Sequence, residues 1–200
     1  MIGARVGIVT LGLMMACDRE RPEQTPVWDI PRATAPVTID GKSDDTIWPV
    51  AWRSPPLEDA RGHRTPHAEL RLAGDDECLY ALVYAADEEL RTRPRSDDPR
   101  GVGDEIRLTV GNTRIQLAPG RHEAPEGVRV AMNMDGSVDE AGDMDEEWIT
   151  EIAIPWKHLG ATAQTDGVPV RMSRVDAPKG ERERALAWPK DRPARVRLQR

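Results

Sequence analysis

The chain has 200 residues, enough for one domain and a tail, and it carries a formal net charge of −7. This charge argues against nucleic acid as a partner, because phosphate binding requires a basic face. Six Trp, two Tyr and no Phe leave a core that must be built from Val, Leu, Ile, Ala and Trp.

An apolar run, Val6–Ala16, stands near the start of the chain. It is too short to span a bilayer as a helix but suits the core of a signal peptide. Its end, Leu13-Met14-Met15-Ala16-Cys17, resembles the lipobox of bacterial lipoproteins. The resemblance implies a signal peptide at residues 1–16 and acylation of Cys17 with fatty acids such as palmitate. Several acyl chains would hold the protein at an inner or outer membrane of a bacterial cell envelope. The alternative is an ordinary signal peptide that is cut elsewhere.

Residues 17–35 are polar and rich in proline. Such a segment cannot bury much surface and predicts a semi-stiff tether between the anchor and the domain. Trp28 and Ile30 are its apolar exceptions and are candidates for docking on the domain. Acylation of Cys17 leaves Cys78 as a lone thiol, which we expect to pack as a small hydrophobe.

Residues 36–200 show short apolar stretches separated by turn residues, without a long helical period. The dipeptide Gly111-Asn112 predicts a hairpin between the stretches that flank it. The pattern predicts one all-β domain, an antiparallel β-sandwich of about nine strands with at most short helical turns. The expected strands are 37–39, 67–73, 78–86, 104–110, 113–118, 128–134, 148–154, 168–175 and 195–198, with 52–54 as a further candidate.

The stretch Trp148–Trp156 has the clearest strand pattern. Its alternate residues, from Trp148 through Ile152 to Trp156, form an almost wholly apolar face, which is the period-two signature of a half-buried strand. Pro155 cannot donate to a β-ladder, so the strand should end there. Residues 157–160 then fit one helical turn that is closed by a glycine.

Three motifs follow one another along the chain. Ile39–Trp48 reads IDGKSDDTIW, Leu79–Asp87 reads LYALVYAAD, and Trp148–Trp156 reads WITEIAIPW. Together they resemble the family 9 carbohydrate-binding modules and their DOMON-like relatives, over about residues 36–200. The resemblance implies a β-sandwich that binds an oligo- or polysaccharide without catalysing a reaction.

The resemblance also indicates where a sugar site would lie. Binding members of the family carry W-x-x-D-x-x-E at the third long strand. Asp104 matches the Asp here, whereas the Trp position falls on Gly101 and the Glu position on Arg107. Arg129 and Arg174 are candidates to hydrogen-bond sugar hydroxyls or carboxylates, although arginines in strands are more often solvated. One stacking platform and one carboxylate of the family site are therefore missing.

Trp188 is the candidate for the second stacking platform, which the family carries late in the chain. A platform needs an exposed aromatic face with a few polar side chains around it. The alternative is a core tryptophan beside Pro189. Trp48 and Trp156 lie in the motifs that mark the fold, and we expect both in the core.

Two functional hypotheses remain. The first is a membrane-anchored carbohydrate-binding module, and the second is a structural or interaction lipoprotein that keeps the sandwich but has lost the sugar site. We expect no enzyme, because the sequence has no nucleophile elbow or phosphate loop and marks no carboxylate pair as a glycosidase dyad. The oligomeric state is not predicted.

Two bound groups are further alternatives. The acidic loop after 128–134 is a candidate for calcium but lacks the EF-hand spacing and also fits a solvated loop. Some DOMON-like relatives carry haem, for which methionines and a histidine near one strand are candidates, with core methionines as the simpler interpretation. The residues are Asp135, Asp139, Asp143 and Asp145 for calcium, and Met132, Met134 and His122 for haem.

Overall fold

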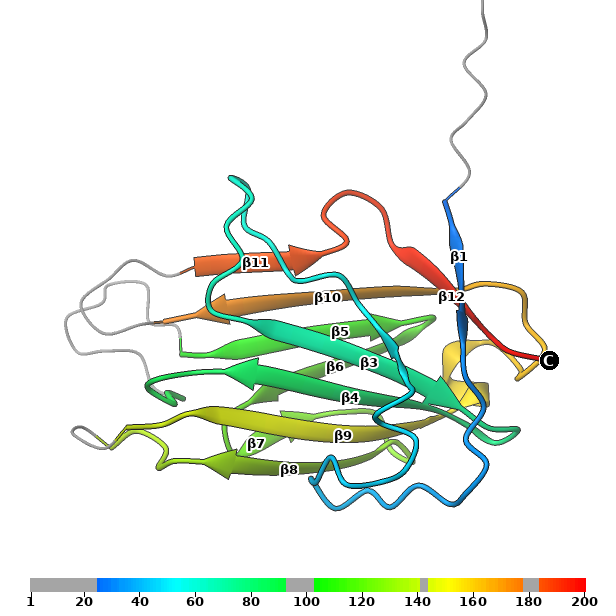
Figure 1. The fold of residues 1–200 in the computed structure, drawn as a ribbon, viewed down its shortest axis with the longest axis horizontal. Helices are drawn as coiled ribbons and strands as arrows, with labels where there is room; N and C mark the ends of the chain where they lie inside the picture. Colours follow the sequence, from blue (N-terminus) through cyan, green and yellow to red (C-terminus); the bar gives the residue numbers. More distant parts are fainter. Residues whose placement is uncertain (1–24, 93–102, 141–143, 178–183) are drawn as a thin grey trace, which may run out of the picture.

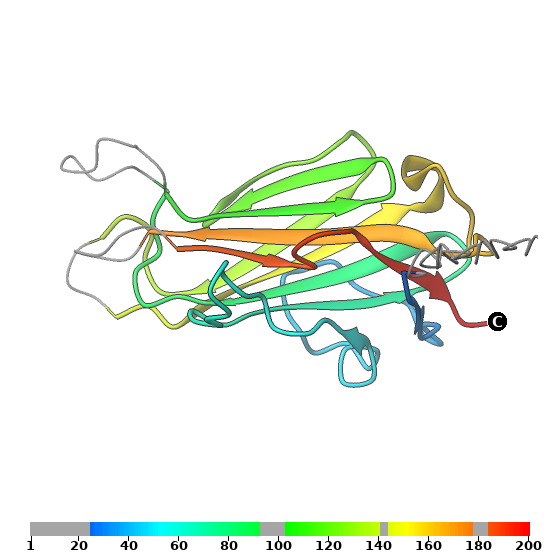
Figure 2. The same ribbon diagram turned by 90° about the horizontal axis from the view of Figure 1, so that it is seen from above.

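Two β-sheets pack face to face in the computed structural model, which describes residues 25–92, 103–140, 144–177 and 184–200 (Figure 1 and Figure 2). The described residues form twelve strands and one helical element, the 3₁₀ turn η1 (Trp156–Leu159). The all-β sandwich predicted from the alternating pattern is confirmed. The strands absent from the prediction, β1 (Val27–Ile30), β7 (Arg121–Glu123) and β11 (Arg184–Trp188), are short.

The seven-stranded sheet is built around a long central strand, β10. Its pairs are antiparallel except that of β1 with β12, which is parallel. The spatial order is β1, β12 (Ala194–Leu198), β10 (Val168–Asp176), β5 (Glu105–Val110), β6 (Thr113–Ala118) and β7, with β11 (Arg184–Trp188) also paired to β10.

The five-stranded sheet has β4 and β9 at its centre, and all its pairs are antiparallel. The spatial order is β2 (Trp52–Arg53), β3 (Ala68–Gly74), β4 (Cys78–Ala86), β9 (Glu147–Pro155) and β8 (Arg129–Asp135). As predicted, β9 ends at Pro155, and Gly160 closes η1 in the left-handed conformation at φ 64°.

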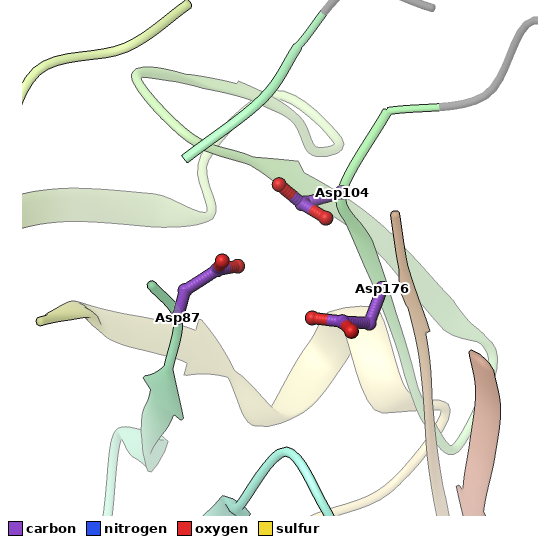
Figure 3. Close-up of side chains that lie close together, drawn as sticks. All are labelled: Asp87, Asp104 and Asp176. Carbon is purple, nitrogen blue, oxygen red and sulfur yellow. The ribbon is translucent and has the colours of Figure 1, made fainter. Parts of the chain in front are cut away.

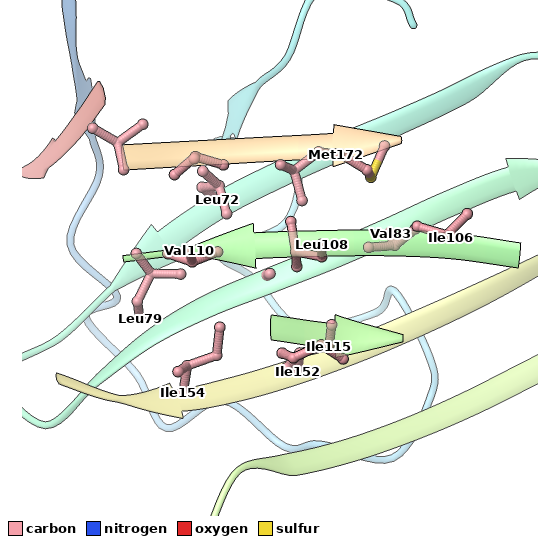
Figure 4. Close-up of a cluster of buried hydrophobic side chains, with 14 of the residues drawn as sticks. Leu72, Leu79, Val83, Ile106, Leu108, Val110, Ile115, Ile152, Ile154 and Met172 are labelled. Atoms are coloured by element: carbon pink, nitrogen blue, oxygen red, sulfur yellow. The ribbon is translucent and has the colours of Figure 1, made fainter. Parts of the chain in front are cut away.

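The main core lies between the two sheets and is built from alternate residues of their strands (Figure 4). These side chains are fully or almost fully buried, and each large aliphatic one contributes about 1.5–3 kcal/mol through its removal from water. Figure 4 labels Ile106, Leu108, Val110, Ile115 and Met172 from one sheet, and Leu72, Leu79, Val83, Ile152 and Ile154 from the other.

A second apolar layer covers the outer face of the five-stranded sheet. Residues 37–51 lie over it without forming a strand, so the strand expected at 37–39 is wrong. The reason is that this segment bonds to side chains: Thr38 N donates to Asp45 Oδ2 at 2.9 Å. Trp48 is the anchor of the layer and is fully buried, and Trp156 is 5% exposed, so both lie in the core as expected.

The segment expected to be a tether contributes to the sandwich. Val27–Ile30 is a strand in ladder with β12, and Ile30 is fully buried in the main core. The β-sandwich therefore begins before residue 36. The signal peptide and Cys17 lie outside the described residues. Within the described residues, Cys78 is a buried free thiol and no helix has the length and apolar character to cross a bilayer.

Candidate functional site

The five residues predicted for a sugar site lie in separate parts of the sandwich. Arg107 is on the outer face of the seven-stranded sheet, where it is 66% exposed and paired with Glu105. Arg129 is exposed on the outer face of the five-stranded sheet, opposite Ala153 in the ladder with β9. Because the two arginines are on opposite outer faces, they cannot bind the same sugar.

Arg174 and Asp104 meet inside the sandwich, in a cluster with Asp87 and Asp176. Arg174 Nη2 donates to Asp87 Oδ2 at 2.9 Å and to Asp176 Oδ1 at 2.8 Å. Because Asp87 follows β4 and Asp176 ends β10, this arginine links the two sheets. Asp104 accepts hydrogen bonds from the backbone of both neighbouring loops. Figure 3 shows the three aspartates pointing toward one another.

This buried cluster cannot serve as a surface sugar site. Arg174 is 1% exposed and Asp104 is 2% exposed, so neither reaches a ligand outside the protein. Arg174 occupies an inward position of β10, where its two Nη groups donate to two carboxylates and to the carbonyls of His67 and Ala86. The sugar-binding roles predicted for Arg174 and Asp104 are therefore replaced by a structural role.

The electrostatics of the cluster favour a bound proton. Burial, and after it the nearby Asp104, raise the pKa of Asp87 to about 7, although Arg174 acts to lower it. Burial also raises the pKa of Asp104 to about 6, against the lowering effect of its two backbone hydrogen bonds. One arginine cannot neutralise three buried carboxylates, so holding a proton among them lowers the charge of the cluster.

Among the described residues, Asp87, Asp104 and Asp176 lie close enough together to be considered as ligands of one metal ion. Their carboxylate oxygens lie within 4.8 Å of one another. Oxygen donors suit calcium, but Arg174 donates hydrogen bonds to Asp87 and Asp176 in this space. A cation would have to displace or repel that guanidinium, so the residues as arranged do not fit a calcium ion.

In the acidic loop that is the candidate for calcium, two aspartates accept hydrogen bonds from backbone N–H groups. Asp145 is buried and accepts hydrogen bonds from Leu90 N at 2.6 Å and Ser137 N at 2.8 Å. Asp139 accepts from Thr92 N at 2.9 Å. Asp143 lies outside the described residues. Two of the four proposed ligands therefore tie neighbouring loops together.

The haem candidates differ in their burial. Met132 and Met134 pack against the core between the sheets, as the simpler interpretation expects. His122 is exposed on β7. Met132 Sδ accepts a hydrogen bond from Gly120 N at 3.2 Å.

Three tryptophans form a row along one open edge of the sandwich, and we call this row the tryptophan rim. Trp28 of β1 contacts Trp52 of β2, with ring centroids 5.9 Å apart, and Trp52 contacts Trp188 of β11 at 5.4 Å. The rings are tilted by 44° and 46°. Such tilted aromatic pairs are favourable beyond the area they bury. The row joins edge strands of both sheets.

Exposure decreases along the tryptophan rim from its outer end inward. Trp28 is 41% exposed, Trp52 is half-buried and Trp188 is 8% exposed. Trp188 therefore does not present the open platform predicted for it, because it packs in the main core under Trp52. The backbone of Glu58 bonds reciprocally with Ala187, at 3.2 and 3.0 Å, and fixes the chain beside it. The exposed aromatic ring of the rim is Trp28.

The sequence matches no family model, and no curated protein matches it. Two solved structures of a family 9 carbohydrate-binding module from Caldicellulosiruptor kristjanssonii, one with cellotriose and one with glucose, have TM-scores of 0.60 and 0.62. Both cover 86% of this chain, at 14% and 13% identity, and 93% and 95% of their own. The fold of the chain resembles that of carbohydrate-binding modules. A protein from Bacteroides uniformis, named as a candidate carbohydrate-binding protein, gives a TM-score of 0.50 at 9% identity over 88% of this chain and 100% of its own.

The resemblance of this fold to carbohydrate-binding modules does not place a site on this chain. Sequence reasoning missed Trp28 and Trp52 as a surface, because the two lie in separate short strands. One signal was present: Trp28 and Ile30 are two residues apart and therefore share a strand face. We expected Trp28 and Ile30 to dock on the domain, but the sequence did not identify Trp52 as the partner of Trp28.

Proposed function

We propose that the domain binds carbohydrate at the tryptophan rim, with Trp28 as the stacking residue and without catalysing a reaction. The observation that carries this proposal is the half-exposed indole of Trp28, held against Trp52 by a ring contact at 5.9 Å. An indole face covers the apolar C–H face of a pyranose, and a ring that is already ordered loses little entropy on binding. The fold shared with carbohydrate-binding modules supports the same function.

The site we propose differs from the one that the family motif implies. Arg107 and Arg129 lie on opposite faces, and Arg174 and Asp104 are buried. Trp28 comes from the N-terminal strand, which the motif does not include. A structural or interaction role is the second candidate, and the burial of Trp188 favours it because that residue was the predicted platform.

We further propose that the protein is a lipoprotein of a bacterial cell envelope, anchored to a membrane through acylated Cys17. The support is the lipobox-like sequence Leu13–Cys17 after an apolar run. At most about 3.3–3.6 Å per residue separates Cys17 from Val27, so the tryptophan rim would lie within a few tens of ångströms of the anchor.

Binding of the full chain to a panel of immobilised glycans tests the function. Trp28→Ala should remove binding, whereas Met144→Ala, which removes an 85% exposed apolar side chain elsewhere, should leave it unchanged. Trp28→Tyr should retain part of the binding, because it restores an aromatic face. Equal binding by the wild type and Trp28→Ala would show that carbohydrate does not bind at the tryptophan rim.

A further inference from the structure

We propose that two copies of this chain form a symmetric dimer through strand β8, so that the two five-stranded sheets join into one continuous sheet. This inference goes beyond the proposed function and does not depend on it, because β8 and Trp52 of the tryptophan rim lie at opposite edges of the five-stranded sheet. The partner is a second copy of the chain because the residues of β8 complement themselves in one antiparallel register.

Among the described strands, β8 is the longest that lies at the edge of a sheet. It has seven residues, whereas the edge strands β1, β2 and β7 have four, two and three. At a further edge, β11 is held by the reciprocal backbone bonds between Ala187 and Glu58. Proteins commonly keep edge strands short or covered, because an unpaired row of N–H and C=O groups pairs readily with another strand. Figure 1 shows β8 at the bottom of the view, along the border of its sheet.

The backbone of β8 is bonded on one side, to β9. Within the described residues, no backbone group of residues 129–134 bonds to any segment other than β9. The turn at Gly41 crosses the outer face of β8, but its N–H donates to the side chain of Glu151 on β9. It therefore does not occupy the outward hydrogen-bonding groups of β8.

The inward side chains of β8 show that solvent reaches its open side. Val130, Met132 and Met134 pack against the main core and are nevertheless partly exposed. Their ladder partners on β9 are fully buried. Because β9 has a neighbouring strand on each side, the exposure of the three apolar side chains arises at the open side of β8. A strand added there would cover them.

Symmetry restricts how two β8 strands can pair. A two-fold axis perpendicular to the sheet places inward residues opposite inward residues, and only registers that keep this match are allowed. In the register centred on Met132, all seven residues of β8 find a partner. The pairs are Met132 with its own copy, Val130 with Met134, Ala131 with Asn133, and Arg129 with Asp135. A shift by two residues in either direction shortens the ladder and separates Arg129 from Asp135.

The charges at the two ends of β8 favour the same register. Arg129 and Asp135 are both exposed, and within the part of the chain that the structure describes neither forms an ion pair. Arg129 hydrogen-bonds to the thiol of Cys78, which is a weak partner for a guanidinium. Opposite charges that face each other in an antiparallel pair stabilise it, and like charges destabilise it. The two-fold axis forms the Arg129–Asp135 pair twice, so the charges select a second copy as the partner.

This dimer would leave both tryptophan rims uncovered. Pairing at β8 places β2, which carries Trp52, at the two outer edges of the joined sheet. Two sugar sites on one particle bind a polymer more tightly than one site, because the second contact is intramolecular. This consequence, unlike the dimer itself, rests on the proposed function.

The molecular mass of the full chain, measured by analytical ultracentrifugation over a wide range of concentration, tests the dimer. We expect the wild type to form a dimer that dissociates on dilution. Arg129→Asp and Asp135→Arg, taken singly, each place like charges opposite one another twice and should weaken dimerisation by about tenfold or more. The two changes together restore opposite charges with reversed polarity and should restore the dimer.

A cysteine at the axis gives a second readout, which reports the register. Met132→Cys faces its own copy, and directly opposed residues of an antiparallel pair have Cα atoms about 4.5–5.5 Å apart, which suits a disulfide. Asn133→Cys lies one residue from the axis, where the two copies are too far apart to be bridged without movement. With Cys17→Ser and Cys78→Ser as the background, oxidation should cross-link the first variant and not the second.

The matched control is Arg114→Asp, which changes one exposed charge on the other sheet and should leave the dimer intact. A wild type that is a monomer at every concentration overturns the inference. A dimer that survives both single charge reversals shows that the copies meet elsewhere, and cross-linking through Asn133→Cys in place of Met132→Cys shows another register. Either result overturns the inference and leaves the proposed function standing, because glycan binding at the tryptophan rim is measured separately.

Discussion

The indole Nε1 of Trp48 donates a hydrogen bond of 2.7 Å to Oε1 of Glu151, although 103 residues separate the two along the chain. The other carboxylate oxygen accepts from Asp40 N and Gly41 N, each at 3.0 Å. The first and third sequence motifs are therefore the two halves of one buried contact. Gly41 is needed there, since a Cβ at its φ of 88° would lie 2.7 Å from the backbone of Met132.

Glu151→Ala should destabilise the domain strongly, because it leaves three donors without an acceptor, and two of them, Gly41 N and Trp48 Nε1, are buried. Each orphaned donor costs about 1–3 kcal/mol, so we expect a loss of roughly 3–5 kcal/mol. Urea unfolding measures it. The exposed Glu126 provides the control, and Glu126→Ala should stay within about 0.5 kcal/mol of the wild type. A Glu151→Ala variant as stable as this control would show that the carboxylate does not hold the covering layer.

We expect mutations at the two ends of the tryptophan rim to have different effects on stability and on sugar binding. Trp188 is buried, so Trp188→Ala should cost about 3–5 kcal/mol of unfolding free energy, like Trp156→Ala. Trp28 is 41% exposed, so Trp28→Ala should cost less, about 1 kcal/mol, while removing sugar binding. Paired urea melts and glycan binding of the two variants test this. Stability lost at Trp28 and kept at Trp188 would reverse the assignment of core and surface.

Much of the fold could be predicted because the apolar pattern of most strands is local in the sequence. Buried and less buried residues alternate along β5 and β10 and over most of β3 and β6, and β4 is apolar over its whole length. The pattern failed at 37–39, where Thr38 N donates to the side chain of Asp45, and the residue after this segment, Asp40, donates its N–H to Glu151. A partner more than 100 residues away cannot be read from local pattern.

The candidate site was less predictable, for two physical reasons. Trp28 and Trp52 are in contact because β1 forms an edge of the seven-stranded sheet and β2 forms an edge of the five-stranded sheet. This arrangement depends on the topology of the whole chain. The sequence predicted a surface position for Arg174, either as a sugar-binding candidate or as a solvated side chain, although Arg174 continues the alternation that places Val170 and Met172 in the core. The period-two alternation therefore holds at Arg174. The assumption that an inward position must be apolar was wrong.

The stability of the domain should depend on pH through Asp87 and Asp104. Burial raises the pKa of Asp87 to about 7 and that of Asp104 to about 6, from 3.8. Between about pH 4 and pH 7 the folded protein thus holds more protons than the unfolded chain, so the free energy of unfolding should fall as pH rises. Asp29 and Asp75, whose pKa values are lowered, act below this window and with the opposite sign.

Urea unfolding at several values from about pH 4.5 to pH 7.5 checks the direction. Asp87→Asn should flatten the dependence, since the amide does not titrate. The exposed Asp191 is the control, and Asp191→Asn should preserve the slope of the wild type. Stability that increases toward pH 7 in the wild type would contradict the raised pKa values.

Lipid anchoring is tested separately from folding, because Cys17 lies outside the described residues. Labelled palmitate should enter the wild type and not Cys17→Ser in a bacterial host. Cys78→Ser should be labelled like the wild type, since Cys78 is buried in the second apolar layer. Equal labelling of the wild type and Cys17→Ser would remove the anchor from the proposed function.

Arg174 provides the last prediction. Arg174→Ala removes the cation that Asp87 and Asp176 share, together with the hydrogen bonds that it donates to the carbonyls of His67 and Ala86. Breaking a buried pair from one side typically costs about 3–5 kcal/mol, because the remaining charge is buried without compensation. The loss should be measured by urea unfolding against the exposed Arg114→Ala.

The size of the Arg174→Ala loss should itself depend on pH. Near pH 5 the buried aspartates can take up protons and become neutral, so the missing guanidinium leaves less uncompensated charge. At pH 8 they cannot, and the penalty should reach its full value. An arginine that mattered only through packing and its bonds to His67 and Ala86 would give the same loss at both pH values. A pH-independent loss would therefore rule out the electrostatic role of Arg174 while leaving its structural role intact.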